Sequence, residues 1–389
     1  MTIAMQIHEE GVLGIITLGI WLHLFFGRGG YWRARRFDAD GGESETPGEW
    51  SRVIAVVPAR NEAGTIGQAV AGLMKQDYPG EYSVIVVDDH SEDGTAEIAK
   101  RVAGEGGVEE RLRVVSASTV PAGWTGKVWA LHEGVSSIAA EATTYYWFTD
   151  GDVLHAPDTL RRLVGRAERG RLDLTSLMVL LQAKTVPERM LIPAFLYFFL
   201  KLYPPQWIAD ENANTAGAAG GCILLRREAL ERIGGLAAIR GEVIDDCALA
   251  RAVKRTGGRI WMGLTRKSFS LRGYGGFGEV RDMIARTAFT QLGYSPALLA
   301  ATLTGVFFIY LAPVCLLFSG DASARVLGSM AWVLMSLSFL PIVRFYRLSP
   351  LWALLLPVAA IYYSYATLVS AARYWLGRGG QWKGRAQAH

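Results

Sequence analysis

The distribution of apolar residues divides the chain into a globular middle and apolar ends. Apolar residues concentrate at residues 11–27 and again after residue 296, whereas residues 40–290 have the mixed composition of a globular domain. An α-helix needs about 20 apolar residues to cross a bilayer. The pattern therefore predicts a soluble domain between membrane segments.

Between residues 50 and 150, short apolar runs alternate with helical segments. The expected strands are residues 52–57, 82–87, 111–117 and 143–150, and the expected helices are residues 65–76, 95–104 and 128–140. Continuous β-branched runs separated by helices indicate an α/β fold with a mostly parallel sheet that is covered on both faces. Ligands of such sheets bind beyond the carboxyl ends of the strands.

The first apolar segment, from Gly11 to Gly27, predicts a membrane anchor within residues 1–30. A cleaved signal peptide carries its positive charges before the apolar run. Here Glu9 and Glu10 precede the run, and the positive charges follow it, at Arg28, Arg33, Arg35 and Arg36. Because positive charges stay on the cytoplasmic side, the domain after the anchor is expected in the cytoplasm. A polar linker is expected at residues 38–49.

Three further apolar segments follow the globular region, at about residues 296–318, 326–343 and 351–372. Each is long enough to span a hydrocarbon core. If all three cross, the basic tail at residues 374–389 lies outside, against the positive-inside tendency. Prolines within these runs leave a re-entrant or interfacial path open for one of them, so the membrane region at 296–373 has two or three spans.

Residues 190–205 are rich in aromatic side chains but are interrupted by Pro193 and Lys201. The stretch is too short and too polar for a comfortable membrane span. Two alternatives fit it equally: a helix in a protein core, or a helix lying in the headgroup layer.

Composition and charge support a membrane protein of a reducing compartment. Of 389 residues, 51% are hydrophobic, and the net charge is only +4. Clustered positive charges are also found in nucleic-acid-binding proteins. Beside apolar spans, however, they mark the cytoplasmic membrane face. The three cysteines have no metal-ligand spacing and are too few for a disulfide framework.

Asp150 and Asp152 stand on alternate residues at the end of an expected strand. Two such carboxylates can share one hard divalent cation, Mg²⁺ or Mn²⁺, with a diphosphate. The cation would neutralise a diphosphate leaving group. This signal is weak by itself, since acidic turn residues are common at strand ends.

Asp88 and Asp89 close the second expected strand, where a carboxylate can accept hydrogen bonds from a nucleotide base or a ribose. The alternative is that they are ordinary loop acids. Asp93, a few residues on, is predicted to be the N-cap of the following helix.

Residues 241–258 predict an amphipathic helix that ends at Gly257. Asp245 is the predicted N-cap, which accounts for one carboxylate structurally. Asp246 shares the apolar face with Leu249 and Val253 and has no structural reason to be there. A carboxylate beside other acids has a raised pKa and can serve as a general base.

In this order, the motifs resemble the inverting family 2 glycosyltransferases of the GT-A fold. The matching stretches are VVPARNE (56–62), VVDDHSEDGT (86–95), TDGD (149–152), GGCILLRREALERIGG (220–235) and IDD (244–246). Within that family the chain is most similar to the hopene-associated glycosyltransferases encoded with bacterial hopanoid synthesis. That closer resemblance rests on PAGWTGKVWAL (121–131), GGRIWMGLTR (257–266), RTAFTQLGYSP (286–296), RFYRLSPLWAL (344–354) and GRGGQWKGR (377–385).

The resemblance implies a GT-A domain at residues 50–290 that uses a nucleotide-diphospho-sugar, most simply a UDP-sugar, and a lipid acceptor, a hopanoid. It implies Asp246 as catalytic base, with Asp245 as the neighbouring candidate, and Asp150 and Asp152 as ribose and metal ligands. The remaining donor contacts that it implies are Pro58, Ala59, Glu62, Asp89 and Lys127.

One departure from the family concerns the Q-x-x-R-W motif that many membrane members carry after the base. The corresponding stretch here is RDMIARTAFTQ (281–291), in which Arg286 is a candidate for the motif's arginine but neither Gln nor Trp is in register. This argues against a processive polysaccharide synthase. A non-catalytic scaffold is the other rival, and the joint retention of Asp150, Asp152 and Asp246 argues against it. Neither a Walker A nor a dinucleotide-binding motif follows the first strand, and no nucleic-acid partner is expected.

Overall fold

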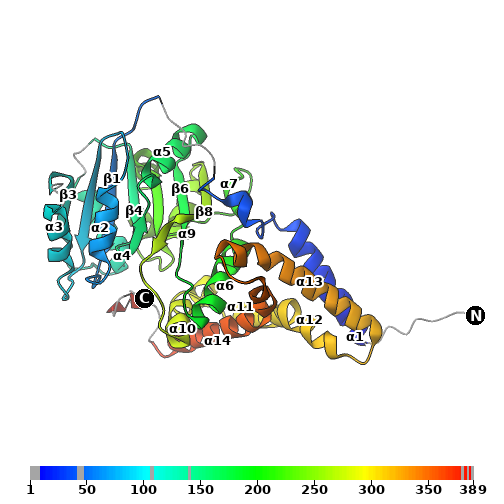
Figure 1. Cartoon of the computed structure of the whole chain (residues 1–389). Helices are drawn as coiled ribbons and strands as arrows, with labels where there is room; N and C mark the ends of the chain where they lie inside the picture. Colours follow the sequence, from blue (N-terminus) through cyan, green and yellow to red (C-terminus); the bar gives the residue numbers. More distant parts are fainter. Residues whose placement is uncertain are drawn as a thin grey trace, which may run out of the picture. The chain divides into compact units, whose positions relative to one another are not determined.

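The computed structural model describes residues 9–41, 48–105, 109–138, 142–377, 381–382 and 385–386. The chain forms two compact units (Figure 1). The sheet unit comprises residues 37–182, 207–273 and 380–389, and the helical unit comprises residues 1–36, 183–206 and 274–379. The structure thus divides the chain differently from the expected 50–290 domain, because residues 183–206 and 274–290 belong to the helical unit.

The sheet unit is built on an eight-stranded mixed sheet with the strand order β3-β2-β1-β4-β7-β6-β8-β5. The strands are β1 (Val53–Ala59), β2 (Tyr82–Asp88), β3 (Leu112–Ser116), β4 (Tyr145–Thr149), β5 (Val153–His155), β6 (Leu174–Leu180), β7 (Cys222–Arg226) and β8 (Ile260–Ser270). The four expected strands form one parallel block, β3-β2-β1-β4. The fold class is confirmed. The sequence did not reveal β5, β6, β7 or β8, and of these β7 runs antiparallel to both β4 and β6.

Helices cover both faces of this sheet. They are α2 (Ile66–Met74), α3 (Thr95–Glu105), α4 (Gly126–Ser136), α5 (Thr159–Gly170), α7 (Pro205–Ala209), α8 (Arg227–Arg232) and α9 (Asp245–Arg255). Gly134 allows α4 to lie directly on β1 and β2, since a Cβ there would be 2.5 Å from Val56 and 2.8 Å from Val87. Side chains alternate along a strand, so Val57 faces the opposite side, where it packs with Val70 of α2.

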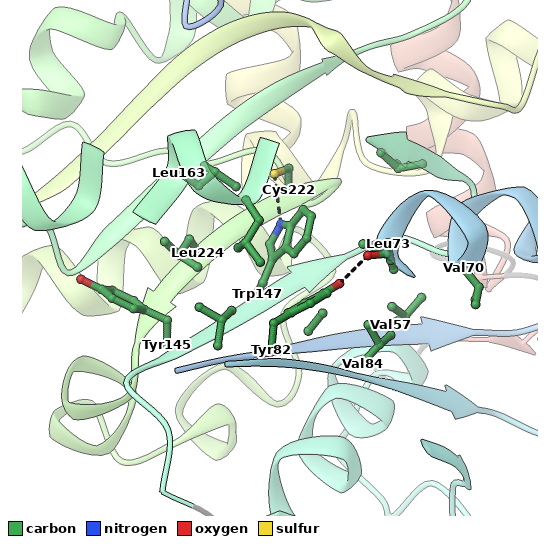
Figure 2. Close-up of a cluster of buried hydrophobic side chains, with 14 of the residues drawn as sticks. Val57, Val70, Leu73, Tyr82, Val84, Tyr145, Trp147, Leu163, Cys222 and Leu224 are labelled. Atoms are coloured by element: carbon green, nitrogen blue, oxygen red, sulfur yellow. Dashed lines mark hydrogen bonds between the residues drawn. The ribbon is translucent and has the colours of Figure 1, made fainter. Parts of the chain in front are cut away.

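The main core lies between the sheet and helices α2 and α5 (Figure 2). Trp147 is fully buried there, and its indole N–H donates to the Cys222 Sγ at 3.3 Å. The hydroxyl of Tyr82 donates to the Leu73 carbonyl at 3.1 Å. Both large rings therefore bury their apolar surface while their polar atoms keep a partner, as buried Trp and Tyr require.

Among its described residues, the helical unit contains four helical stretches that are long and apolar enough to cross a membrane: Glu9–Gly27, Pro296–Phe318, Ala322–Phe345 and Pro350–Trp375. They contain α1 (Glu9–Leu22), α11 (Pro296–Val306), α12 (Ala312–Cys315), α13 (Ala322–Phe345) and α14 (Leu356–Trp375), and the unit also holds α6 (Val186–Leu202) and α10 (Phe277–Ala285). All four apolar segments read from the sequence are thus helical. Of the basic tail, the described part after residue 377 comprises only β9 (Gln381–Trp382) and β10 (Arg385–Ala386).

Side chains of α1 satisfy the backbone where the second of these stretches is irregular. Pro313 has no N–H, so the carbonyl of Ile309, four residues earlier, loses its helical partner. The indole of Trp21 donates to that carbonyl at 2.6 Å, and the hydroxyl of Thr17 donates to the carbonyl of Phe308 at 2.6 Å. Such groups need internal partners in a bilayer because no water is available there.

Helix α6 covers the aromatic stretch whose environment was left open. A capping box formed by Thr185 and Glu188 starts it, and Pro193 lies within it. Leu191, Ile192, Ala194, Leu196, Tyr197 and Leu200 are all buried. This burial favours the core helix over a helix lying in the headgroup layer.

The expected linker at residues 38–49 begins as part of the sheet unit instead. Asp38 forms a β-bridge with Leu264, and Ala39 N–H donates to the Leu264 carbonyl at 2.7 Å. The Asp40 carboxylate accepts hydrogen bonds from Thr265 Oγ1 at 2.5 Å and from Arg266 N at 2.7 Å. Residues 38–40 belong to the sheet unit because their backbone pairs with the free edge of β8 at Leu264. Residues 42–47 of the expected linker lie outside the described residues.

His155 lies in a buried polar chain that supports the end of β4. Its Nε2 is 2.7 Å from Thr149 Oγ1, and its Nδ1 is 2.8 Å from Ser268 Oγ. Because the Thr149 hydroxyl donates to the Gly221 carbonyl at 3.0 Å, Nε2 must carry the ring proton and Nδ1 must accept. Burial lowers the pKa of His155 to about 3, so the folded protein holds a neutral imidazole.

Because the pKa of His155 is lowered in the folded protein, we expect the free energy of unfolding to decrease in acid. The unfolded chain protonates His155 near pH 6.5, whereas the folded chain does so only near pH 3. The contribution is therefore complete above about pH 6.5 and falls by up to ~1.4 kcal/mol per pH unit towards pH 3. Unfolding midpoints of the full chain in detergent, measured from pH 7.5 to 4, should fall less steeply for His155→Gln. Parallel profiles for the two proteins would contradict the prediction.

Candidate active site

The loops after β1 and β2 are joined by reciprocal hydrogen bonds. Asn61, which has a positive φ of 51°, donates through its N–H to Ser91 Oγ at 3.0 Å and accepts from Glu92 N at 3.0 Å. The Asp93 carboxylate accepts from Ala63 N at 2.9 Å and from Thr95 N at 3.1 Å. Asp93 is therefore a link between the two loops and not simply the predicted helix cap. The two loops form one ordered shelf at the carboxyl edge of the sheet.

The two aspartates at the end of β2 differ in their partners. Asp89 is fully buried, and its Oδ2 lies 3.7 Å from Arg60 Nη1. Asp88 is also buried, and its Oδ2 accepts from Ser91 N at 3.4 Å. Its Oδ1 finds no hydrogen-bond donor among the described residues. An unpaired buried acceptor is costly. Asp88, and not the Asp89 that the resemblance implies, therefore has the oxygen that a ligand N–H would relieve.

Asp150 and Asp152 follow β4 on either side of Gly151. Asp150 Oδ1 is 2.8 Å from Lys127 Nζ, and Asp152 Oδ2 accepts from Ser270 Oγ at 3.4 Å. A Cβ at Gly151 would lie 3.6 Å from the side chain of Glu62, which places that predicted donor contact beside this turn. Within the described part of the chain no cluster of three metal-ligating side chains is found. Two carboxylates fit Mg²⁺ best when substrate phosphates complete the coordination.

The antiparallel strand β7 brings a second loop to this edge. Cys222 pairs with Thr149, so the residues before β7 lie beside the residues after β4. Gly220 N–H donates to Asp246 Oδ2 at 2.8 Å. A Cβ at this position would be only 3.0 Å from Lys127 Nζ and 3.4 Å from Asp246 Oδ2. A side chain at position 220 would therefore have to displace the Lys127 ammonium. The Gly-Gly pair before a strand was the sequence feature that could have indicated this close approach.

The paired aspartates at the start of α9 do not have the predicted roles in full. Asp245 is the first helical residue, and the cap position is held by Ile244 without a side-chain hydrogen bond. The N-cap prediction for Asp245 is therefore wrong: its carboxylate lies 3.6 Å from Lys127 Nζ. Asp246 Oδ1 accepts from Cys247 N at 2.7 Å, in addition to the Gly220 bond of its Oδ2. Both acids still benefit from the positive end of the helix dipole.

The charges of this cluster shift the protonation of its members. Burial alone would lower the pKa of Lys127, but Asp150 and Asp245 raise it above the ordinary value, so the ammonium stays charged. Burial, and next the Asp245 carboxylate, raise the pKa of Asp246 to about 6, while Lys127 opposes the shift. A carboxylate with a raised pKa is suited to accept a proton near neutral pH.

Four of the predicted site residues line one small pocket: Pro58, Lys127, Asp150 and Asp245. It is lined by Pro58, Lys127, Leu131, Phe148, Thr149, Asp150, Gly220, Ile223, Leu236, Ile239, Asp245 and Leu249. Ala59 ends β1 one residue beyond Pro58, and Asp246 borders the pocket through Gly220. Arg286, in contrast, is an exposed residue that follows α10 in the helical unit.

Residues 54–234 match the sequence profile described as Glycosyl transferase family 2. The chain carries a family 2 glycosyltransferase domain. The match covers the strands that supply Pro58, Asp88 and Asp150, as well as Lys127 and Gly220. The protein is accordingly a glycosyltransferase. Among curated protein sequences, none matches the chain.

Two solved structures illustrate what the chain is similar to. A mannosyltransferase from Pyrobaculum calidifontis, solved with GDP-mannose and Mn²⁺, is 20% identical, with a TM-score of 0.51 over 92% of this chain and 99% of that chain. A glucosyl-3-phosphoglycerate synthase from Mycobacterium tuberculosis, solved with Mg²⁺ and UDP, is 20% identical, with a TM-score of 0.40 over 71% of this chain and 84% of that chain. The first likeness shows that the sheet unit has the GT-A fold.

Proposed function

We propose that this glycosyltransferase moves a sugar from a nucleotide-diphospho-sugar to a lipid acceptor, with inversion at the sugar. The observation that carries the proposal is the meeting of Lys127, Asp150 and Asp246 at one edge of the sheet. The same chain contains four helical stretches able to cross a membrane. A lipid-soluble acceptor is the substrate class that such a combination serves.

The donor is proposed to lie along the carboxyl edge of the sheet, where ligands of α/β proteins bind. Pro58, Ala59 and Glu62 would contact the nucleoside from the loop after β1. Asp89 would fix the base-binding loop through Arg60, and the unpaired oxygen of Asp88 would accept the base N–H. A uracil N–H suits this role, so a UDP-sugar is the proposed donor.

Asp150 and Asp152 are proposed to hold Mg²⁺ or Mn²⁺ together with the donor's diphosphate. When bound, the ion would stabilise the negative charge that develops on the leaving nucleoside diphosphate. Asp150 also lies next to Lys127. The protein therefore places both a carboxylate and an ammonium where the diphosphate is proposed to bind. Oxygen ligands from two aspartates and a diphosphate match the preferences of both ions.

Asp246 is proposed as the general base. An acceptor hydroxyl would give its proton to the Asp246 carboxylate while its oxygen bonds to the anomeric carbon. The bond from that carbon to the diphosphate oxygen breaks on the opposite side, which inverts the configuration. The hydrogen bonds from Gly220 N and Cys247 N orient the carboxylate without using all of its lone pairs.

The acceptor is proposed to be a hopanoid, in keeping with the subfamily motifs. Arg286 is proposed as a further donor contact in place of the family's Q-x-x-R-W arginine. The absence of that motif in register still disfavours a processive synthase. The enzyme is proposed to work in a bacterial inner membrane, with the sheet unit in the cytoplasm, where nucleotide sugars are made.

Removing divalent metal should abolish transfer. We expect excess chelator to stop sugar transfer to extracted membrane lipid, and Mg²⁺ or Mn²⁺ to restore it. Asp152→Asn should lose roughly 10²-fold or more in rate, because a metal contributes several kcal/mol of charge stabilisation. Asp77→Asn is a matched control, since Asp77 forms only a surface ion pair with Arg161 at 3.2 Å. Full activity in excess chelator would disprove the metal assignment.

The paired aspartates of α9 should fail differently when each is changed to asparagine. Asp246→Asn should lower the transfer rate by ~10²–10⁴-fold, the scale for losing a positioned base, while folding and nucleotide binding remain. Asp245→Asn should keep the rate within about tenfold, because Lys127 retains the closer Asp150. Single-turnover rates and nucleotide titrations measure both effects. If Asp245→Asn is the inactive variant, the base is Asp245.

The charges around the first span predict the side of the catalytic domain. A reporter fused after residue 45 should behave as cytoplasmic, because the arginines follow the span and Glu9 and Glu10 precede it. Alkaline phosphatase, active only outside the cytoplasm, provides the measurement. A fusion after residue 389 should be periplasmic if all three later helices cross and cytoplasmic if two do. Periplasmic activity at residue 45 would contradict the proposed donor supply.

A further inference from the structure

Lys127 lies between Asp150, a proposed metal ligand, and Asp245, the neighbour of the proposed base. Its Nζ lies 2.8 Å from Asp150 Oδ1 and 3.6 Å from Asp245 Oδ2. The side chain is only 16% exposed. The ammonium group therefore contacts an oxygen that a divalent cation would need.

The surrounding structure leaves this ammonium little freedom. Lys127 is the second residue of α4, which is fixed against the sheet by the close approach of Gly134 to Val56. The preceding Thr125 is anchored by its N–H to the Arg240 carbonyl at 2.8 Å. The backbone of Gly220 also lies close to this side chain, since a Cβ at position 220 would be 3.0 Å from Lys127 Nζ. The position of the charge is thus set by the fold.

Two cations cannot share Asp150 without mutual repulsion. A divalent ion bound to Asp150 and Asp152 would lie within a few ångströms of the Lys127 ammonium, in a region where solvent screens charges weakly. A diphosphate changes this balance because its oxygens can accept hydrogen bonds from the ammonium and coordinate the metal at once.

We propose that Lys127 couples metal binding to donor binding. The ammonium holds Asp150 in an ion pair that disfavours a free divalent ion, and it transfers to the diphosphate when donor and metal arrive together. This inference rests on the proposed function, in which Asp150 and Asp152 are metal ligands. Lys127 then acts as a positioning residue whose charge makes the metal site complete only with a nucleoside diphosphate present.

Binding of Mn²⁺ to the full-length protein in detergent tests this coupling, read by electron paramagnetic resonance. In the wild type, Mn²⁺ alone should bind weakly, and saturating UDP or GDP, titrated separately, should tighten it at least tenfold. Lys127→Met should bind Mn²⁺ alone about tenfold more tightly than the wild type, because a repelling charge has gone. The nucleotide should then tighten Mn²⁺ binding by a smaller factor than in the wild type, because the site without nucleotide no longer carries the repelling charge.

Two further variants separate charge from packing. Lys127→Gln keeps a hydrogen-bond donor towards Asp150 without the charge and should behave like Lys127→Met, which keeps the test valid if the methionine variant does not fold. Lys100→Met removes an exposed lysine of α3 and should match the wild type. If Mn²⁺ alone binds the uncharged variants no more tightly than the wild type, the coupling proposal is overturned.

The Asp152→Asn variant distinguishes this failure from a failure of the proposed function. If Mn²⁺ binding in the presence of nucleotide is lost in Asp152→Asn, while Mn²⁺ alone binds Lys127→Met no more tightly than the wild type, the metal site stands and the coupling role of Lys127 falls. If Asp152→Asn binds Mn²⁺ and nucleotide as the wild type does, the metal site of the proposed function is itself wrong, and the coupling falls with it.

Discussion

The candidate active site at the carboxyl edge of the sheet depends on the ion pair between Lys127 and Asp150. The end of β4 and the start of α9 deliver carboxylates to one small region, and like charges at such separations destabilise a fold unless a cation offsets them. The ammonium at 2.8 Å from Asp150 and 3.6 Å from Asp245 supplies that offset. Without it, Asp245 and Asp246 at the start of α9 would be left with only the helix dipole and backbone N–H groups. The chemistry of the site and the stability of its framework therefore rest on the same contact.

The antiparallel strand β7 explains how residues distant in sequence reach this contact. A purely parallel sheet gathers only the carboxyl ends of its strands at the ligand edge. Because β7 runs against β4, its amino end lies at that edge instead, and the Gly220–Gly221 turn enters the site. Gly220 then binds the Asp246 carboxylate through its N–H. The mixed sheet thus provides a backbone donor from the residues that precede β7, whereas a parallel strand would have placed those residues at the opposite edge.

Sequence patterns predicted the parallel half of the sheet, the apolar helices and the acids at the strand ends, because these follow from local periodicity and from chain direction. They could not reveal which of two adjacent acids has which partner. Asp245 had the sequence position of a helix cap, yet its side chain forms a long-range ion pair with Lys127. Asp93 likewise bonds across to the neighbouring loop. The polar stretch at Asp38–Asp40 looked like a linker because edge pairing leaves no periodic signal in so few residues.

The helical unit follows the same rule that an element's role is fixed by its non-local partners. Pro313 frees the carbonyl of Ile309, a defect that an isolated apolar helix could not repair in a bilayer. Trp21 and Thr17, one turn apart on α1, donate to that carbonyl and to its neighbour. Gly14, a further turn away, lets α1 approach α13 closely, since a Cβ there would be 2.9 Å from Leu327. The first apolar segment is consequently more than a tether, because its polar and small residues complete the backbone bonding and packing of the helices that follow the catalytic domain.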